Sequence, residues 1–310
     1  MKLFADYRYG GKVRYVVART DEELMRVPPD IQTCTVFVGY KDASGREIWG
    51  GTAFLLGLSF NDERLGHMVY GITAKHNLID LKGSPRNQTI LIRANLKSGG
   101  AESLPTNFSD WYLHPTEDIA VLDWPEDERP AVVYVPEAMC QDAEGLKARR
   151  IDEGDEVFIA GLFRRHYGRS RNVPVIRIGN IAMMPDEPIP SRIGEIEGAY
   201  LVEIRSIGGL SGSPTFVHYQ IPQFRPPRFQ WHLIGMIHGH WDVPKEAFTD
   251  FDDSNEQINM GMAIIIPINK VLEFLKTHPE LKKRREDIIA EEKEKALPAM
   301  DGRSPESVSD

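Results

Sequence analysis

The sequence predicts an all-β protein made of two strand-rich units, with a helix near the C-terminal end. Short β-type runs separated by turn signals fill residues 31 to about 135, and a second set fills residues 156 to about 267. Many short strands with regular turns are typical of sandwiches and barrels. We therefore expect an N-terminal extension (1–30), a first β unit (31–135), a second β unit (150–268), and a C-terminal helix with a charged tail (269–310).

Each element has its own local signal. In the extension, residues 7–19 can pair as a hairpin around Gly10-Gly11, and Pro28-Pro29 ends that segment. The polar stretch 136–154 can hold a helical turn. The strands expected in the first unit are 33–39, 52–56, 67–73, 89–93 and 119–122. Those expected in the second unit are 157–160, 175–178, 200–204, 215–217, 233–237 and 263–266.

The helical pattern begins only near residue 270. Asn269 is a candidate cap for a helix over 271–275, and a charged helix should run from about Pro279 to Lys295. Its apolar residues Leu281, Ile288 and Ile289 are expected to dock it on the β units. The charged tail after Pro298 is predicted to be disordered.

Composition excludes several classes of protein. Among 310 residues, 37 are Lys or Arg and 46 are Asp or Glu, so the net charge of −9 argues against nucleic-acid binding. The longest apolar runs are far shorter than the roughly 20 residues that span a bilayer, and the N-terminal stretch lacks a signal-peptide pattern. Cys34 and Cys140 fit neither a disulfide framework nor a metal site. We expect a cytoplasmic protein with free thiols, no metal and no cofactor.

Three motifs carry chemistry. The first is Gly71-Ile-Thr-Ala-Lys-His76, preceded by Gly51-Thr-Ala-Phe. The second is Thr116-Glu-Asp118-Ile-Ala-Val, and the third is Gly208-Gly-Leu-Ser211-Gly-Ser-Pro. A serine hydroxyl becomes a strong nucleophile only when a base takes its proton, and an imidazole held by a carboxylate is such a base at neutral pH. Glycines before the serine leave backbone N–H groups free to turn toward a substrate oxyanion.

Taken together, the motifs resemble those of the trypsin/chymotrypsin-like serine proteases, specifically their bacterial and intracellular branches. The order His, Asp, Ser and the spacing fit that family over about residues 31–268. The resemblance implies two antiparallel β-barrels of the chymotrypsin-like type, the first carrying His76 and Asp118 and the second Ser211. It implies a serine endopeptidase that works through an acyl-enzyme, with Gly209 and Ser211 as oxyanion-hole donors.

Other residues compete for these roles. His67 and His114 lack the Thr-Ala context of His76 and are interpreted as structural. Asp110 can cap a turn, and Asp123 follows an apolar run as a strand-end residue. Ser213 competes with Ser211, but Gly-x-Ser-Gly selects Ser211.

Leu210 departs from the family pattern, because family members often have Asp or Asn there. In secreted members that aspartate pairs with an amino terminus freed by cleavage. Leucine cannot make this ion pair, so activation by a new N-terminus is not expected.

Substrate specificity is less clearly encoded. By the resemblance, Arg205, Ser206, His238 and Gly239 border the primary pocket, which would favour an acidic residue just before the scissile bond. In the competing interpretation Arg205 points to solvent and His238 packs beside the triad. The basic loop 163–172 is either a solvated hairpin tip or, by the resemblance, a border of the leaving-group side of the cleft.

Three functions compete on these residues. The first is an active endopeptidase on a protein or peptide substrate, restrained in the cell by a regulatory protein partner or by narrow specificity. The second is an inactive protease-fold scaffold or partner-binding module. The third is an acyl transferase on the same scaffold. A complete triad with both oxyanion donors favours the first.

Overall fold

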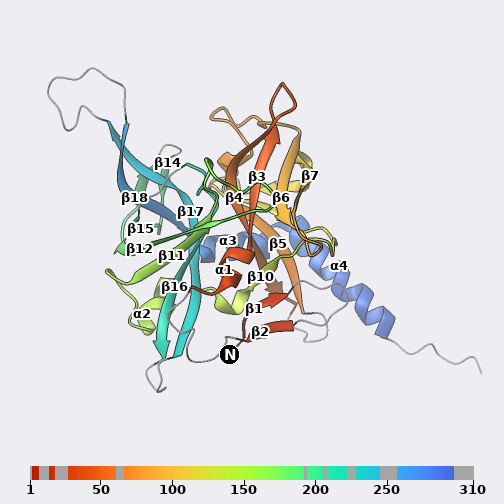
Figure 1. Ribbon diagram of the computed structural model, residues 1–310. Coiled ribbons are helices and arrows are strands. Elements are labelled where there is room, and N and C mark those ends of the chain that lie inside the picture. The colour runs from red at the N-terminus through yellow and green to blue at the C-terminus, as the bar shows by residue number, and fades with distance from the viewer. Residues whose placement is uncertain are drawn as a thin grey trace, which may run out of the picture.

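The computed structural model describes residues 2–6, 14–17, 27–60, 66–191, 194–204, 208–221, 228–244 and 257–296. Two β units stand side by side, and the C-terminal helices pass between and beside them (Figure 1). This arrangement confirms the predicted all-β, chymotrypsin-like class with C-terminal helices. No helix in the described part of the chain is long and apolar enough to cross a membrane.

The first unit is a rolled sheet centred on the long strand β4. Its strands are β3 (Thr35–Lys41), β4 (Glu47–Ser59), β5 (His67–Thr73), β6 (Thr89–Asn95), β7 (Ala101–Asn107), β8 (Trp111–Leu113) and β9 (Ala120–Asp123). β4 pairs with β3 through its first half and with β5 through its second half. One arm continues through β6 to β7 and the other through β9 to β8, and no strand pairing of the described residues joins the two ends. The unit is therefore a half-barrel.

The second unit closes completely. Its strands are β11 (Glu156–Gly161), β12 (Val175–Met183), β15 (Tyr200–Glu203), β16 (Pro214–Ile221), β17 (Arg228–Pro244) and β18 (Gln257–Pro267). They pair antiparallel around a closed barrel in the order β11-β12-β15-β18-β17-β16. A separate hairpin is formed by β13 (Ile189–Ser191) and β14 (Gly194–Ile196). Closure removes the unpaired sheet edges that a half-barrel keeps.

Each unit has its own apolar core, and a third core joins them. Val38, Leu55 and Ile92 belong to the first core, and Ile159 and Ile265 belong to the second. The joining core draws on both units and on the C-terminal helices; among its members are Phe54, Tyr70, Phe158, Phe216 and Phe274. Burial of such large side chains contributes about 1.5–3 kcal/mol each, so this shared core fixes the two units against one another.

The N-terminal extension forms the expected kind of hairpin, with strands shifted from those predicted. β1 (Lys2–Asp6) pairs antiparallel with β2 (Arg14–Val17), and the predicted turn at Gly10-Gly11 lies outside the described residues. β1 also pairs with β10 (Val133–Pro136), which joins β4 in parallel. A short helix, α1 (Pro29–Thr33), then leads into β3.

The helices differ from the prediction mainly at their starts. The polar connection holds η4 (Glu137–Met139) and α2 (Ala143–Ala148). α3 (Ile268–Thr277) starts directly after Pro267, so Asn269 lies inside the helix and the predicted cap is wrong. Pro267 is the N-cap, with an extended backbone (ψ 144°), so the first helical residue is Ile268.

α4 (Pro279–Ala296) runs along the outer side of the first unit (Figure 1). Leu281 is fully buried and Ile288 packs half-buried on the joining core, as predicted. Arg285 donates a hydrogen bond to the hydroxyl of Tyr70 on β5 at 2.9 Å. The predicted disordered tail after Pro298 lies outside the described residues.

Candidate active site

The pairing of β5 with β9 brings His76 and Asp118 together. His76 lies in η2 (Lys75–Asn77), just after β5, and Asp118 lies just before β9. Thr73 and Ala120 are register partners in this antiparallel pair. Because the strands run in opposite directions, His76, three residues after Thr73, lies next to Asp118, two residues before Ala120.

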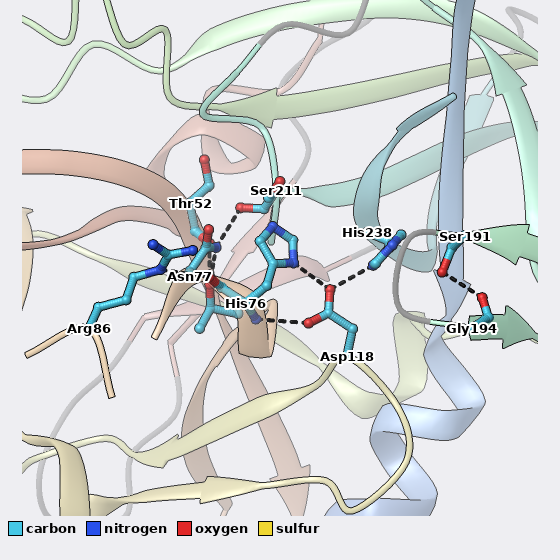
Figure 2. A network of polar contacts seen from close by, with 10 residues as sticks. Thr52, His76, Asn77, Arg86, Asp118, Ser191, Gly194, Ser211 and His238 are labelled. Atoms are coloured by element: carbon cyan, nitrogen blue, oxygen red, sulfur yellow. Dashed lines mark hydrogen bonds and ion pairs between the residues drawn. The ribbon is translucent and has the colours of Figure 1, made fainter. Parts of the chain in front are cut away.

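Asp118 holds His76 at two points (Figure 2). The imidazole Nδ1 of His76 lies 2.6 Å from Oδ2 of Asp118, and the backbone N–H of His76 donates to Oδ1 at 2.8 Å. A carboxylate can only accept, so Nδ1 must carry the ring proton. In the neutral imidazole, Nε2 then keeps its lone pair, which is the atom that a general base uses.

His238 on β17 contacts the same carboxylate oxygen. Its Nδ1 donates to Oδ2 of Asp118 at 2.6 Å, and its ring lies 5.7 Å from that of His76, nearly edge-on at 82°. His238 and Asp118 are both buried. Burial alone would raise the pKa of Asp118, but the N–H groups of His238 and His76 outweigh it and hold that pKa well below its usual range.

His76, Asp118 and His238 also form a group of three potential metal ligands. Two ligands of one Zn²⁺ ion, each bonded at about 2.0–2.1 Å, lie about 3.3 Å apart in a tetrahedral site. The two nitrogen-to-oxygen distances here are each 2.6 Å, which is the length of a charge-assisted hydrogen bond. The arrangement is therefore a hydrogen-bonded triplet.

The loop before Asp118 is fixed from several sides. Nδ1 of His114 accepts the backbone N–H of Glu117 at 2.9 Å. The carboxylate of Glu117 pairs with Lys270 of α3 at 2.6 Å, and Lys75 donates to the carbonyl of His114 at 2.7 Å. His114 thus has the structural role that the sequence suggested, and α3 helps to position the acid.

The competing carboxylates are used elsewhere. Asp110 closes a capping box with Asn107 at η3 (Phe108–Asp110). Asp123 pairs with Arg284 of α4, and burial raises the pKa of Asp123 to about 6. Of the three candidate acids, Asp118 is the one that contacts the ring of His76.

Ser211 lies on a tight turn before β16, and its backbone is held by the first unit. Its carbonyl accepts the backbone N–H of Thr52 at 2.9 Å and Nδ2 of Asn77 at 3.0 Å. Asn77 directly follows His76, so one short segment contacts both the acid–base pair and the serine turn. In Figure 2 the Ser211 side chain lies on the side of the His76 ring away from Asp118.

Two glycines of the turn have backbone conformations that other residues rarely adopt. The φ angles of Gly209 and Gly212 are +109° and +86°. A Cβ atom on Gly212 would lie 2.1 Å from the carbonyl oxygen of Thr52. The Gly-x-Ser-Gly pattern is therefore required by geometry here.

Thr52 supports the turn that carries Ser211, a role that the three sequence motifs did not predict. Its hydroxyl donates to the carbonyl of Gly209 and accepts the N–H of Leu162, both at 2.8 Å. It is fully buried. The sequence did contain an indication of this role, because Thr52 belongs to the Gly51-Thr-Ala-Phe segment that precedes the histidine motif.

A cavity of about 240 Å³ opens beside the serine turn. His76 and Ser211 both line it, together with Gly209. Neither the N–H of Gly209 nor that of Ser211 donates a hydrogen bond within the part of the chain that the structure describes. These two groups can therefore serve a ligand in the cavity.

The predicted specificity residues are only partly described. Arg205 and Ser206 lie outside the described residues, so the expected acidic preference before the scissile bond stays a prediction. His238 packs beside the acid and uses Nδ1 there, and Gly239 lies next to it on β17. Leu210 is buried in the core of the second unit, where an ion pair with a chain terminus has no place.

No family model and no curated protein matches this chain. Among solved structures it is similar to Deg5, with a TM-score of 0.47 and 16% identity over 81% of this chain and 92% of that chain. It is also similar to the HtrA-type protease AlgW with decapeptide, with a TM-score of 0.47 and 14% identity over 80% of this chain and 65% of that chain. A third similar structure is the inactive form of a mutant of Rv3671c from M. tuberculosis H37Rv, with a TM-score of 0.42 and 14% identity over 84% of this chain and 94% of that chain. Identities this low concern the fold alone, and with these TM-scores the geometry of the site has to carry any inference about function.

Proposed function

We propose that this chain is a serine endopeptidase in which Ser211, His76 and Asp118 form the catalytic triad. The observation that carries the proposal is the two-point contact of His76 with the buried carboxylate of Asp118. It leaves Nε2 of the imidazole as the free base on the side where Ser211 lies (Figure 2).

The chemistry follows from these positions. Oγ of Ser211 attacks the substrate carbonyl carbon while Nε2 of His76 takes the hydroxyl proton. The N–H groups of Gly209 and Ser211 stabilise the tetrahedral oxyanion, each by about 3–4 kcal/mol. The C–N bond then breaks as His76 returns the proton to the leaving amine. Water, activated by the same imidazole, hydrolyses the acyl-enzyme.

A fluorophosphonate probe tests the proposal, because it labels only a serine with an activated hydroxyl. We expect labelling of the wild type at Ser211, and its loss in both Ser211→Ala and His76→Ala. Ser213→Ala is the matched control in the same turn. The Ser213 hydroxyl is buried and has no hydrogen-bond partner among the described residues, so its removal should leave labelling and folding intact.

Hydrolysis of a denatured protein, followed by mass spectrometry of the new termini, then separates peptidase from acyl-transferase action. Absence of Ser211-dependent labelling in folded protein would instead favour the inactive scaffold. Circular dichroism of each variant establishes that the fold is retained.

A further inference from the structure

The cavity beside Ser211 has a cationic wall. Arg86 and Arg164 line it together with His76 and Ser211. Arg164 also lines the adjoining cavity with Phe163, Arg165 and Gly208. Positive groups therefore extend from the candidate nucleophile along the basic loop.

Arg164 lies directly over the glycines that precede Ser211. An added Cβ on Gly209 would meet Cγ of Arg164 at 2.7 Å, and one on Gly208 would meet its Nη1 at 3.5 Å. The contact at Gly208 would be an ordinary van der Waals one, so it is the missing side chain of Gly209 that lets Arg164 approach the turn. A ligand in the cavity would meet this charge near the oxyanion-hole donors.

Arg86, which lines the same cavity, lies beside Asn77 and His76 (Figure 2). Its Nε donates to the carbonyl of His76 at 3.0 Å. Its two terminal nitrogens form no hydrogen bond within the described ranges, so they remain able to bind a ligand. Their position is set by the segment that carries the candidate base.

The basic loop is anchored to the first unit. Asn172 is buried at its end, where Oδ1 accepts from Nη1 of Arg93 on β6 at 2.6 Å. The other terminal nitrogen of Arg93 donates to the carbonyl of Arg169 at 3.1 Å. The C-terminal end of the loop is therefore held against the first unit, while Arg164 and Arg165 are exposed to solvent beside the cavity.

Within the described ranges, the cavity arginines have no acidic partner, although the chain has an excess of acid. Arg129 pairs with Asp127 and Glu102, and Arg284 pairs with Asp123. No described carboxylate forms an ion pair with Arg86, Arg164 or Arg165, although the sequence has 46 acidic residues against 37 basic ones. Guanidinium groups left unpaired beside a candidate nucleophile can pair with a carboxylate of the substrate.

The direction of proton transfer indicates which half of the substrate occupies this cavity. In the proposed mechanism His76 gives its proton to the leaving amine, so the leaving half of the substrate lies against the imidazole. The cavity is bordered by His76, Asn77 and strands β3 and β4 of the first unit. The leaving half should therefore enter it.

We propose that Arg164 and Arg86 select substrates with an acidic side chain shortly after the scissile bond. This inference rests on the proposed peptidase function. It is separate from the preference before the bond that Arg205 suggested, because it uses other residues and another part of the substrate. The local positive charge of these two arginines would then attract acidic peptides, although the protein as a whole has a net negative charge.

The test reads both sides of every cleaved bond. Peptides from a denatured proteome are cut by the wild type, and mass spectrometry of the new termini gives residue frequencies before and after the bond. A matched pair of quenched peptides, with Asp or Asn at the favoured position after the bond, then gives the ratio of kcat/KM. We expect about a 3- to 20-fold advantage for Asp, reduced by added salt.

Three variants sharpen the outcome. Arg164→Gln should lower the Asp/Asn ratio, with Arg86 accounting for the preference that remains, and Arg164→Glu should shift the preference toward Lys. Arg171→Gln removes the same charge from the same loop, away from the cavity, and should leave the ratio unchanged. Enrichment of acid only before the bond, an unchanged ratio in Arg164→Gln, or an equal loss in Arg171→Gln would overturn the inference. Failure of fluorophosphonate labelling would overturn the proposed function instead.

Discussion

The two β units contribute to the site in different ways. The half-barrel supplies an acid–base pair built within one sheet, where the short contacts of His76 with Asp118 follow directly from the pairing of β5 with β9. The closed barrel supplies Ser211 on a glycine-rich turn. That turn is held in part by hydrogen bonds from the other unit, through Thr52 and Asn77.

In the proposed mechanism, this difference separates the strength of His76 as a base from the alignment of Ser211 as a nucleophile. Contacts inside the first unit set the tautomer and orientation of His76. Contacts between the units set where Ser211 and Gly209 lie relative to it. Mutations in the two sets should therefore affect activity by different amounts and by different routes.

The largest effect is expected inside the acid–base pair. Asp118→Asn keeps the shape of the side chain but lets its amide donate, which favours the wrong imidazole tautomer. Turnover should fall by about 10⁴-fold at neutral pH. Peptide hydrolysis and fluorophosphonate labelling rates measure this. A loss below about tenfold would mean that Asp118 does not orient the base.

The next effect is expected between the units. Thr52→Val removes the hydroxyl that bonds Gly209 and Leu162, leaving a buried carbonyl and a buried N–H without partners. Stability should fall by about 2–4 kcal/mol, and turnover by about 10- to 100-fold as the turn loses its hold. Urea unfolding and kinetics on the folded fraction measure the two effects.

Thr215→Val is the matched control for Thr52→Val. The Thr215 hydroxyl is buried and forms no hydrogen bond within the part of the chain that the structure describes, so the same change there should cost little. Equal losses in the two variants would show that the bridge contributes nothing of its own.

A smaller effect is expected at His238, which links the barrel to the acid. His238→Ala removes one of the two N–H groups that donate to Oδ2 of Asp118. The carboxylate then stabilises the imidazolium form of His76 more strongly. Turnover should fall by about tenfold, and the acid limb of the kcat/KM profile should move to higher pH. His238→Gln retains an N–H donor and should restore part of the loss. A loss of activity with an unmoved acid limb would reduce His238 to packing alone.

The smallest effects concern stability against pH, and the two units should respond in opposite directions. Burial raises the pKa of Asp123 in the first unit to about 6, against about 3.9 when unfolded. The folded state then holds more protons between about pH 4 and 6, so this group lowers stability as pH rises through that window. Burial lowers the pKa of His232 in the second unit to about 4, against about 6.5 when unfolded. This group lowers stability as pH falls from about 6.5 to 4.

Urea unfolding at several pH values separates these two contributions. Asp123→Asn should remove a decrease of about 1–3 kcal/mol seen on raising the pH. His232→Leu should remove a decrease of similar size seen on lowering it. Parallel pH profiles for wild type and both variants would contradict the assignments.

Much of the fold could be predicted from local pattern. The two strand-rich blocks, the C-terminal helices and the burial of Leu281 follow from alternation and helical periodicity, which depend on nearby residues. The predicted cap of α3 is wrong by two residues, because Pro267 and not Asn269 is the N-cap. Closure of the second unit, compared with the half-barrel of the first, depends on pairings between strands far apart in sequence.

The candidate residues His76, Asp118, Ser211 and Gly209 could be predicted from local motifs, because their chemistry requires particular residue types in a short local context. The preference for Asp118 over Asp110 and Asp123 also came from its motif. Tertiary structure alone decided which distant groups join them. Thr52, His238 and Arg164 reach the site from other strands and loops. The hydrogen bond of Thr52 to Gly209 spans 157 residues of sequence, and that of His238 to Asp118 spans 120. Such contacts are set by strand pairing and core packing, which no local pattern records.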